Sequence, residues 1–133
     1  MLRTYLTERW GLRYPILGAP MVGATDGKLA RAITKAGALG QIGISSETSV
    51  EYLEAEAAIA RGDDETRFGV GLMIWALERR PELFEAAIAA RPFLLALSFG
   101  SPGPYVERAH AAGILVATQV NTAASTYGRG RNK

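Results

Sequence analysis

Hydrophobic residues in this chain fall into short unbroken runs, separated by longer stretches in which they recur every three or four positions. The unbroken runs predict buried strands over residues 15–19, 39–44, 68–73, 93–99 and 114–120. The intervening stretches predict helices over about 26–36, 50–60 and 105–112, with a further helix that starts near Pro81 and stops at Arg91. The pattern therefore predicts a series of five βα units.

Polar and glycine residues mark the ends of these helices. Thr25 or Asp26 is suited to cap the first long helix, because either side chain has an oxygen that accepts from a free backbone N–H. Gly37, Gly62 and Gly113 stand where helices stop and where a left-handed residue is needed. The first βα unit is thus well defined, and such folds bind ligands in the loop that follows the strand.

The predicted strands are apolar on both faces, which is typical of parallel strands covered by helices. Two folds fit this pattern, and periodicity does not choose between them. One is the first half of a TIM (β/α)₈ barrel, and the other is a complete flavodoxin-like doubly wound sheet. In the half-barrel, the residues expected to line the inside are Ile16, Ile42, Val70, Leu97 and Val116.

Composition excludes several classes of function. The chain has 133 residues, 48% of them hydrophobic, which is enough for one domain with a core. It has no cysteine and a single histidine, which excludes disulfides, thiol catalysis and a metal site made of several histidines, so we expect no metal. Charges of both signs are interspersed and the net charge is only +2, so we expect no nucleic-acid partner.

The ends and loops of the chain give further expectations. No hydrophobic run approaches the roughly 18 residues of a membrane span, so we expect no membrane partner and a cytoplasmic protein. Residues 2–13 are expected to cover one end of the core, and the acidic turn at 63–65 to be solvated. A domain over residues 1–125 is followed by the basic stretch 126–133, which we expect to be a disordered tail.

Short runs at the strand ends carry a more specific signal. They are Tyr-Pro-Ile-Leu-Gly-Ala-Pro-Met at 14–21, Ala-Gly-Ala-Leu-Gly-Gln-Ile-Gly at 36–43, Phe-Gly-Val-Gly-Leu at 68–72, Leu-Ser-Phe-Gly at 97–100 and Gln-Val-Asn-Thr at 119–122. In this order they resemble the N-terminal half of the nitronate monooxygenase family, formerly called 2-nitropropane dioxygenases. Relatives of that family include a flavin-dependent enoyl-acyl-carrier reductase. The resemblance covers nearly the whole chain, up to about Ser125.

The resemblance implies a partial FMN-binding TIM barrel. Its activity would be that of an FMN-dependent oxidoreductase that oxidises small nitronates or nitroalkanes with O₂. The backbone of Ala19, Pro20 and Met21 would lie along the flavin ring, and Gln119 would reach its polar pyrimidine edge. Gly71 belongs to the same cofactor site, although family members usually carry a flavin-contacting asparagine there.

The substrate side of the site would be bordered by Ser98, Phe99 and Gly100. No catalytic residue is assigned, because the histidine that serves the family as a base would lie beyond the end of this chain, as would the loops that hold the FMN phosphate. His110 does not match that histidine and is expected on the surface.

The resemblance therefore implies a truncated barrel. Two alternatives stay open, a catalytically inactive half-barrel fragment and a small flavodoxin-like binding domain. A half-barrel has two open sheet edges with unpaired backbone groups, so we expect a homo-oligomer that forms through those edges.

Overall fold

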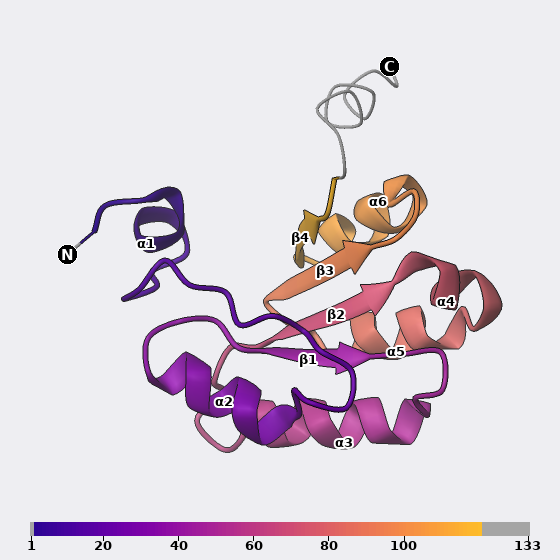
Figure 1. The fold of residues 1–133 in the computed structure, drawn as a ribbon, viewed down its shortest axis with the longest axis horizontal. Coiled ribbons are helices and arrows are strands. Elements are labelled where there is room, and N and C mark those ends of the chain that lie inside the picture. Colours follow the sequence, from indigo (N-terminus) through magenta and orange to yellow (C-terminus); the bar gives the residue numbers. More distant parts are fainter. Residues whose placement is uncertain (1, 121–133) are drawn as a thin grey trace.

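Four parallel strands form one sheet in which the spatial order is the order along the chain (Figure 1). The computed structural model describes residues 2–120, so the predicted tail at 126–133 lies outside the described residues. The strands are β1 (Gln41–Ile44), β2 (Gly69–Met73), β3 (Leu94–Ser98) and β4 (Leu115–Thr118). The helices are α1 (Tyr5–Arg9), α2 (Gly27–Lys35), α3 (Val50–Arg61), α4 (Ile74–Arg79), α5 (Glu82–Ala89) and α6 (Gly103–Ala111).

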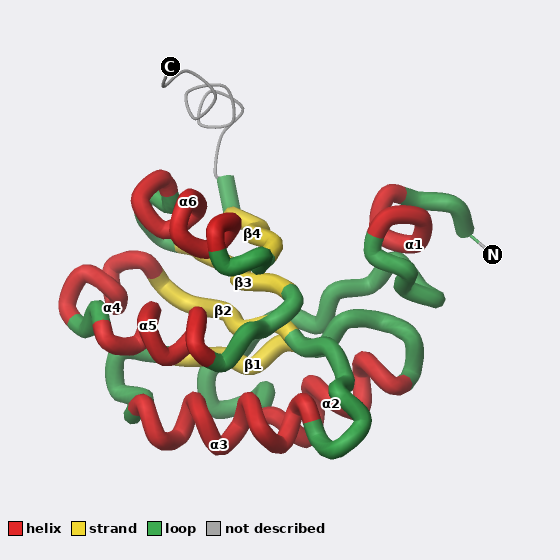
Figure 2. The backbone as a smooth tube through the Cα atoms, turned by 180° about the vertical axis from the view of Figure 1, so that it is seen from behind, coloured by secondary structure: helices red, strands yellow, loops and turns green. Residues whose placement is uncertain are grey.

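The strand order decides between the two predicted folds. A flavodoxin-like sheet reverses its strand order at a switch point and carries helices on both faces. Here the order is sequential without reversal, and α3, α5 and α6 pack against the same face of the sheet (Figure 2). The chain is therefore half of an α/β barrel, as one alternative predicted, and the flavodoxin-like alternative is wrong.

The predicted first strand, residues 15–19, forms only a single parallel bridge, between Leu17 and Leu39. Gly18 donates its N–H to the carbonyl of Leu39 at 2.8 Å. The carbonyl of Gly18 then accepts from a side chain, because Gln41 Nε2 lies 2.8 Å away. Prolines at 15 and 20 have no N–H to continue the ladder. The segment thus follows the edge of β1 without becoming a regular strand.

The outer face of the sheet carries large branched side chains that pack under the helices. The strands contribute side chains in register, such as Ile42 beside Val70 and Val70 beside Leu95. The helices contribute Leu53, Leu83 and Phe84, all at most 1% exposed. Burial of this kind stabilises a fold by about 25 cal/mol for each Å² of apolar surface removed from water.

The inner face carries small residues, which corrects one expectation. Gly43, Gly71, Ala96 and Ala117 lie side by side in the registers of the four strands. Most of the residues predicted to line the inside lie elsewhere, because the alternation along each strand places them on the other face, although Leu97 also borders the cavity at the carboxyl ends of the strands. Ile42, Val70 and Leu97 belong to the core under the helices, Val116 is half-buried against that core, and Ile16 is exposed at the surface.

The amino-terminal segment covers the amino ends of the strands, as predicted (Figure 1). Leu12 is buried and packs with Leu39 and Leu94 in a second, smaller core. The ring of Trp10 meets Phe93 edge-on with ring centres 5.6 Å apart. This end of the half-barrel is therefore closed by the chain's own residues.

Helix ends agree with the capping residues in the sequence. Asp26 caps α2, with its side chain accepting from the N–H of Leu29 at 2.8 Å. Gly37, Gly62 and Gly113 have positive φ angles of 105°, 56° and 75°, as expected for residues that stop helices. No helix in the described range 2–120 is long and apolar enough to cross a membrane.

One helix, α4, has no counterpart in the sequence prediction. It follows β2 directly and buries Ile74, Ala76 and Leu77. Arg80, at its end, donates to the carbonyls of Ser46 at 2.9 Å and Thr48 at 2.8 Å. The helix is thus held by contacts with a distant loop, which a local pattern does not encode.

The acidic turn at 63–65 is more than a solvated loop. Asp64 lies 2.8 Å from Arg31 and 2.8 Å from Lys35, both on α2, and accepts from Thr66 at 2.8 Å. Hydrogen bonds from Lys35, then Thr66 and Arg31, hold the pKa of the Asp64 carboxyl well below its usual range. Asp64 therefore joins the turn after α3 to α2.

Candidate functional site

A cavity of about 390 Å³ opens at the carboxyl ends of the strands. Parallel strands bring these ends to one edge of a sheet, which is where α/β barrels bind their ligands. Part of the lining comes from residues 19–25, which form the 19–25 loop. The rest comes from residues near the carboxyl ends of β1, β2, β3 and β4.

Five of the eight residues predicted for the site line this cavity. Pro20 comes from the 19–25 loop and Gly71 from β2. Ser98 ends β3, Phe99 follows it, and Gln119 follows β4. Residues far apart in the sequence are therefore brought to one place, although no ligand is present to test their predicted roles.

The other three predicted residues, Ala19, Met21 and Gly100, lie outside the lining. Met21 has its side chain 52% exposed, and Ala19 is also exposed. Gly100 packs closely against Ile74, since a Cβ atom on this glycine would lie 2.5 Å from Ile74 Cγ2. Roles for these three residues stay predictions.

Sequence reasoning missed several lining residues. Met73 and Thr118 are the last residues of β2 and β4, and both line the cavity. Ser98 was assigned from the family resemblance, and its place at the end of a parallel strand is shared by these two residues. Val22 lies in the same loop as the predicted residues Pro20 and Met21 and also lines the cavity.

Side chains around the cavity are uncharged. Ser98, Thr118 and Gln119 supply the polar groups, and no Asp, Glu, Lys, Arg or His lines the cavity within the described range. His110 lies on α6 and is exposed, as predicted. Residues 2–120 contain no cluster of three or more potential metal ligands. The cavity suits a mainly apolar ligand with a few polar atoms.

Two glycines allow the 19–25 loop to lie on the inner face of the sheet. A Cβ atom on Gly71 would lie 2.2 Å from the Cβ of Pro20. A Cβ atom on Gly43 would lie 2.4 Å from the backbone carbon of Met21. Any side chain at either position would displace the loop. The space beside Gly71, where members of the family that the sequence resembles usually carry an asparagine side chain, is therefore occupied by Pro20.

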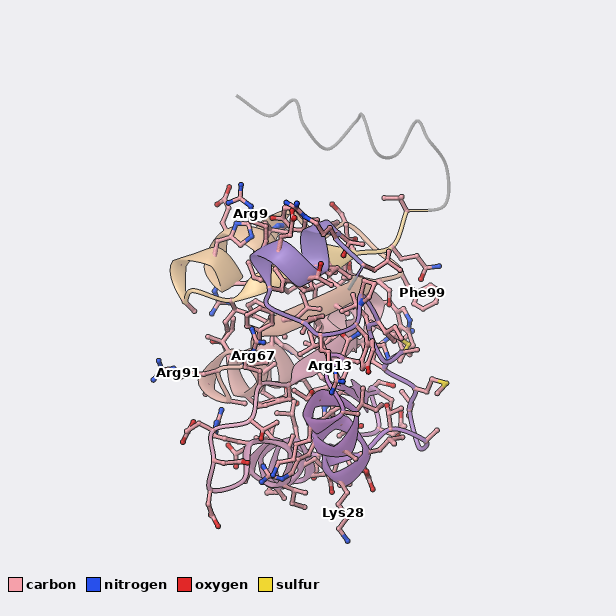
Figure 3. The ribbon with its side chains drawn as sticks, turned by 90° about the vertical axis from the view of Figure 1, so that its left-hand side faces the viewer. Arg9, Arg13, Lys28, Arg67, Arg91 and Phe99 are labelled. Carbon is pink, nitrogen blue, oxygen red and sulfur yellow. The ribbon has the colours of Figure 1, made fainter. Side chains whose placement is uncertain are left out.

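Phe99 is held in an unusual conformation beside the cavity. Its φ angle is +58°, a left-handed value that is costly for a bulky residue, and its side chain is 61% exposed. Figure 3 shows this ring projecting from the body of the molecule on the side opposite Arg91. Strained residues of this kind cluster at ligand sites, which makes Phe99 a candidate contact residue.

The geometry agrees with solved structures of α/β barrels. No family model matches the chain, and no curated protein gives a significant match. FabK from Thermotoga maritima is 25% identical with a TM-score of 0.83, and the match covers 97% of this chain and 42% of that one. Inosine 5′-monophosphate dehydrogenase from Legionella pneumophila is 17% identical with a TM-score of 0.64, covering 84% and 34%.

A third similar structure is a nitroalkane oxidase from Streptomyces ansochromogenes. It is 22% identical with a TM-score of 0.71, and the match covers 96% of this chain and 46% of that one. FabK is an enoyl-ACP reductase of the 2-nitropropane dioxygenase family, so the resemblance found in the sequence is confirmed by these structural neighbours. The chain spans less than half the length of each of these proteins.

Proposed function

We propose that this chain forms part of the FMN site of an oxidoreductase of the nitronate monooxygenase type, with a small nitronate or nitroalkane as substrate and O₂ as oxidant. The observation that carries the proposal is the cavity, because five of the eight residues assigned by resemblance line it. The structural neighbours include an oxidase and a dehydrogenase by name, which supports an oxidoreductase. A cytoplasmic location belongs to the same proposal.

The lining fits the ring system of FMN. Pro20, Gly71 and Phe99 would hold the flat apolar rings, and Ser98 and Gln119 carry the donors and acceptors that their polar edge requires. FMN, when bound, supplies the electron transfer to O₂. No charged side chain of the lining is available to hold the phosphate, so the described residues account for the ring and not for the phosphate.

Proton transfer is the step that these residues do not provide. Oxidation of a nitroalkane requires removal of the proton next to the nitro group, which enzymes assign to a positioned base. The lining contains no carboxylate, imidazole or amine. A nitronate has already lost that proton and is the substrate that this cavity suits better. The inactive half-barrel fragment is the remaining alternative, and it predicts no turnover with either substrate.

Titration of the 133-residue protein with FMN, followed by flavin absorbance and fluorescence, tests the cofactor assignment. We expect saturable binding that Gln119→Leu and Phe99→Ala each weaken by up to roughly tenfold, the effect of losing one hydrogen bond or one ring contact. His110→Gln, on the exposed face of α6, is the control and should leave binding unchanged. Absence of saturable binding would contradict the proposal, and equal binding by all variants would place the flavin elsewhere.

Assembly is a separate proposal, carried by the open edge of the sheet. β4 pairs with β3 alone among the described strands, and its residues Leu115, Val116 and Ala117 are only half-buried. Ile16, beside the opposite edge, is 57% exposed. Two copies that pair these edges would cover both inner faces. Size exclusion with light scattering should show a dimer, and a stable monomer would contradict this proposal.

A further inference from the structure

Thr25 is a buried hydroxyl at the end of the 19–25 loop, with 5% of its surface exposed. Its position before α2 first suggests a helix cap. Asp26 already fills that role through the N–H of Leu29, so the Thr25 side chain is free for another contact. That contact lies in the loop that borders the cavity.

The hydroxyl of Thr25 binds both polar backbone atoms of Met21. It accepts from the Met21 N–H at 2.8 Å and donates to the Met21 carbonyl oxygen at 3.0 Å. The same carbonyl also accepts from the N–H groups of Ala24 at 3.1 Å and Thr25 at 2.9 Å. The peptide groups on both sides of the Met21 Cα are therefore held in place, by the Thr25 hydroxyl and by the backbone hydrogen bonds of a tight turn.

Backbone contacts carry this arrangement to the sheet. The Thr25 carbonyl accepts from the N–H of Gly43 on β1 at 3.1 Å. Gly43 has no side chain, and a Cβ atom there would lie 2.4 Å from the Met21 carbon and 2.6 Å from the Val22 nitrogen. The loop therefore lies directly on β1, with Pro20 and Val22 turned into the cavity lining.

We propose that Thr25 is a positioning residue that fixes the backbone of Met21 and thereby the wall of the cavity formed by Pro20 and Val22. The ligand part of this inference rests on the proposed function, in which that wall lies against the flavin. The structural part does not depend on it. Met21 itself is half exposed, so its order comes from Thr25 and not from burial of its own side chain.

Amide hydrogen exchange tests the structural part without any ligand. The Met21 amide should exchange at least roughly tenfold more slowly than that of Val22 or Gly23, because it alone of the three donates to a buried hydroxyl. This measurement needs only the unmodified protein. Equal exchange of the three amides would overturn the proposal, whatever the variants do.

Three substitutions test the effect on the cavity. Thr25→Val keeps the shape and removes the hydroxyl, and Thr25→Ser restores it. Thr34→Val is the matched control, because the Thr34 hydroxyl also accepts from a buried backbone N–H, that of Gly40 at 2.9 Å, without contacting the 19–25 loop. We expect Thr25→Val to accelerate exchange of the Met21 amide and to weaken FMN binding roughly tenfold. Thr25→Ser should restore both to within about twofold.

The outcomes separate this inference from the proposed function. If the unmodified protein does not bind FMN, the proposed function fails, and the exchange data still decide the role of Thr25. If FMN binds and Thr25→Val binds it as tightly as the unmodified protein, the positioning role fails alone. If Thr34→Val weakens binding as much as Thr25→Val, the effect is one of general stability and the inference is overturned.

Discussion

The two faces of the sheet differ in what their side chains do. The outer face carries residues such as Ile42, Val70 and Leu95, which are fully buried under the helices. The inner face carries glycine and alanine at the facing positions of the same strands, Gly71 and Ala96 among them. These small residues leave room for a loop and a cavity where the outer face has close-packed side chains.

This difference separates stability from ligand binding. Removal of a large side chain from the outer face leaves a void and loses buried surface. The inner face has few large side chains to lose, and its glycines instead determine how near the 19–25 loop approaches the strands. The same four strands thus form a core on one side and a site on the other.

The largest expected effect concerns chemistry at the inner face. General-base catalysis typically contributes about 10² to 10⁴-fold to a rate, and no lining residue can act as the base. Oxidation of 2-nitropropane by the FMN-supplemented protein should therefore not exceed that by free FMN, as measured by O₂ consumption. The nitronate of the same compound should react faster than the nitroalkane. Rapid turnover of the neutral nitroalkane would show that a base exists outside the lining.

The next effect compares two phenylalanines on opposite faces. Phe84 is 1% exposed and belongs to the core under the helices, so Phe84→Ala should lower the free energy of unfolding by about 3–5 kcal/mol. Phe99 is mostly exposed, so Phe99→Ala should change it by less than about 0.5 kcal/mol. Urea denaturation measures both. Similar losses in the two variants would remove the distinction between the faces.

A smaller effect is expected where a glycine contacts the 19–25 loop. Gly71→Ala places a Cβ atom against Pro20, and we expect a loss of about 1–3 kcal/mol in unfolding free energy together with weaker FMN binding. Gly103→Ala is a comparison that adds a Cβ atom away from the 19–25 loop, because no atom outside its chain neighbours and its own helix lies within 4 Å of that Cβ. It should leave FMN binding unchanged, and any loss of stability would come from Pro104, which disfavours the helical conformation of the alanine before it. Unchanged stability in Gly71→Ala would mean that the loop does not rest on β2.

The smallest effect concerns the outer layer at low pH. Ion pairing lowers the pKa of Asp64 in the folded state, so its contribution to stability is fully present above its unfolded pKa of about 4 and is lost gradually as the pH falls from there through the lowered folded pKa. Asp64→Asn should lower the melting temperature slightly at pH 7, and this difference should shrink steadily as the pH is lowered from about 4 to about 2. Asp63→Asn, on a neighbour with no ion pair among residues 2–120, is the control. A difference that is as large at pH 2 as at pH 7 would show that the effect is not one of ionisation.

Much of the local structure was predictable from the sequence. Helix starts and stops depend on residues within one turn, so Asp26 and Gly37 indicated the ends of α2 correctly. The ends of β1 and β2 followed from where each apolar run stops, and the ends of β3 and β4 were placed slightly too far along the chain. Such helix and strand ends depend on residues that are close together in the sequence, so a local pattern is enough to predict them. Ser98, Phe99 and Gln119 were assigned to the site from the family resemblance, and they line the cavity.

Tertiary structure decided the rest, because it depends on pairing between distant segments. Apolar runs without alternation do not indicate which residues face the helices, so Ile42 and Val70 were assigned to the wrong face. The choice between a half-barrel and a doubly wound sheet required the pairing order of the strands. Residues 15–19 do not form a regular strand. The carbonyl of Gly18 is instead bound by the side chain of Gln41, which lies 23 residues later in the sequence, and a local pattern does not predict such a contact. The sequence determined the elements and their ends, and long-range contacts decided which face became a core and which became a site.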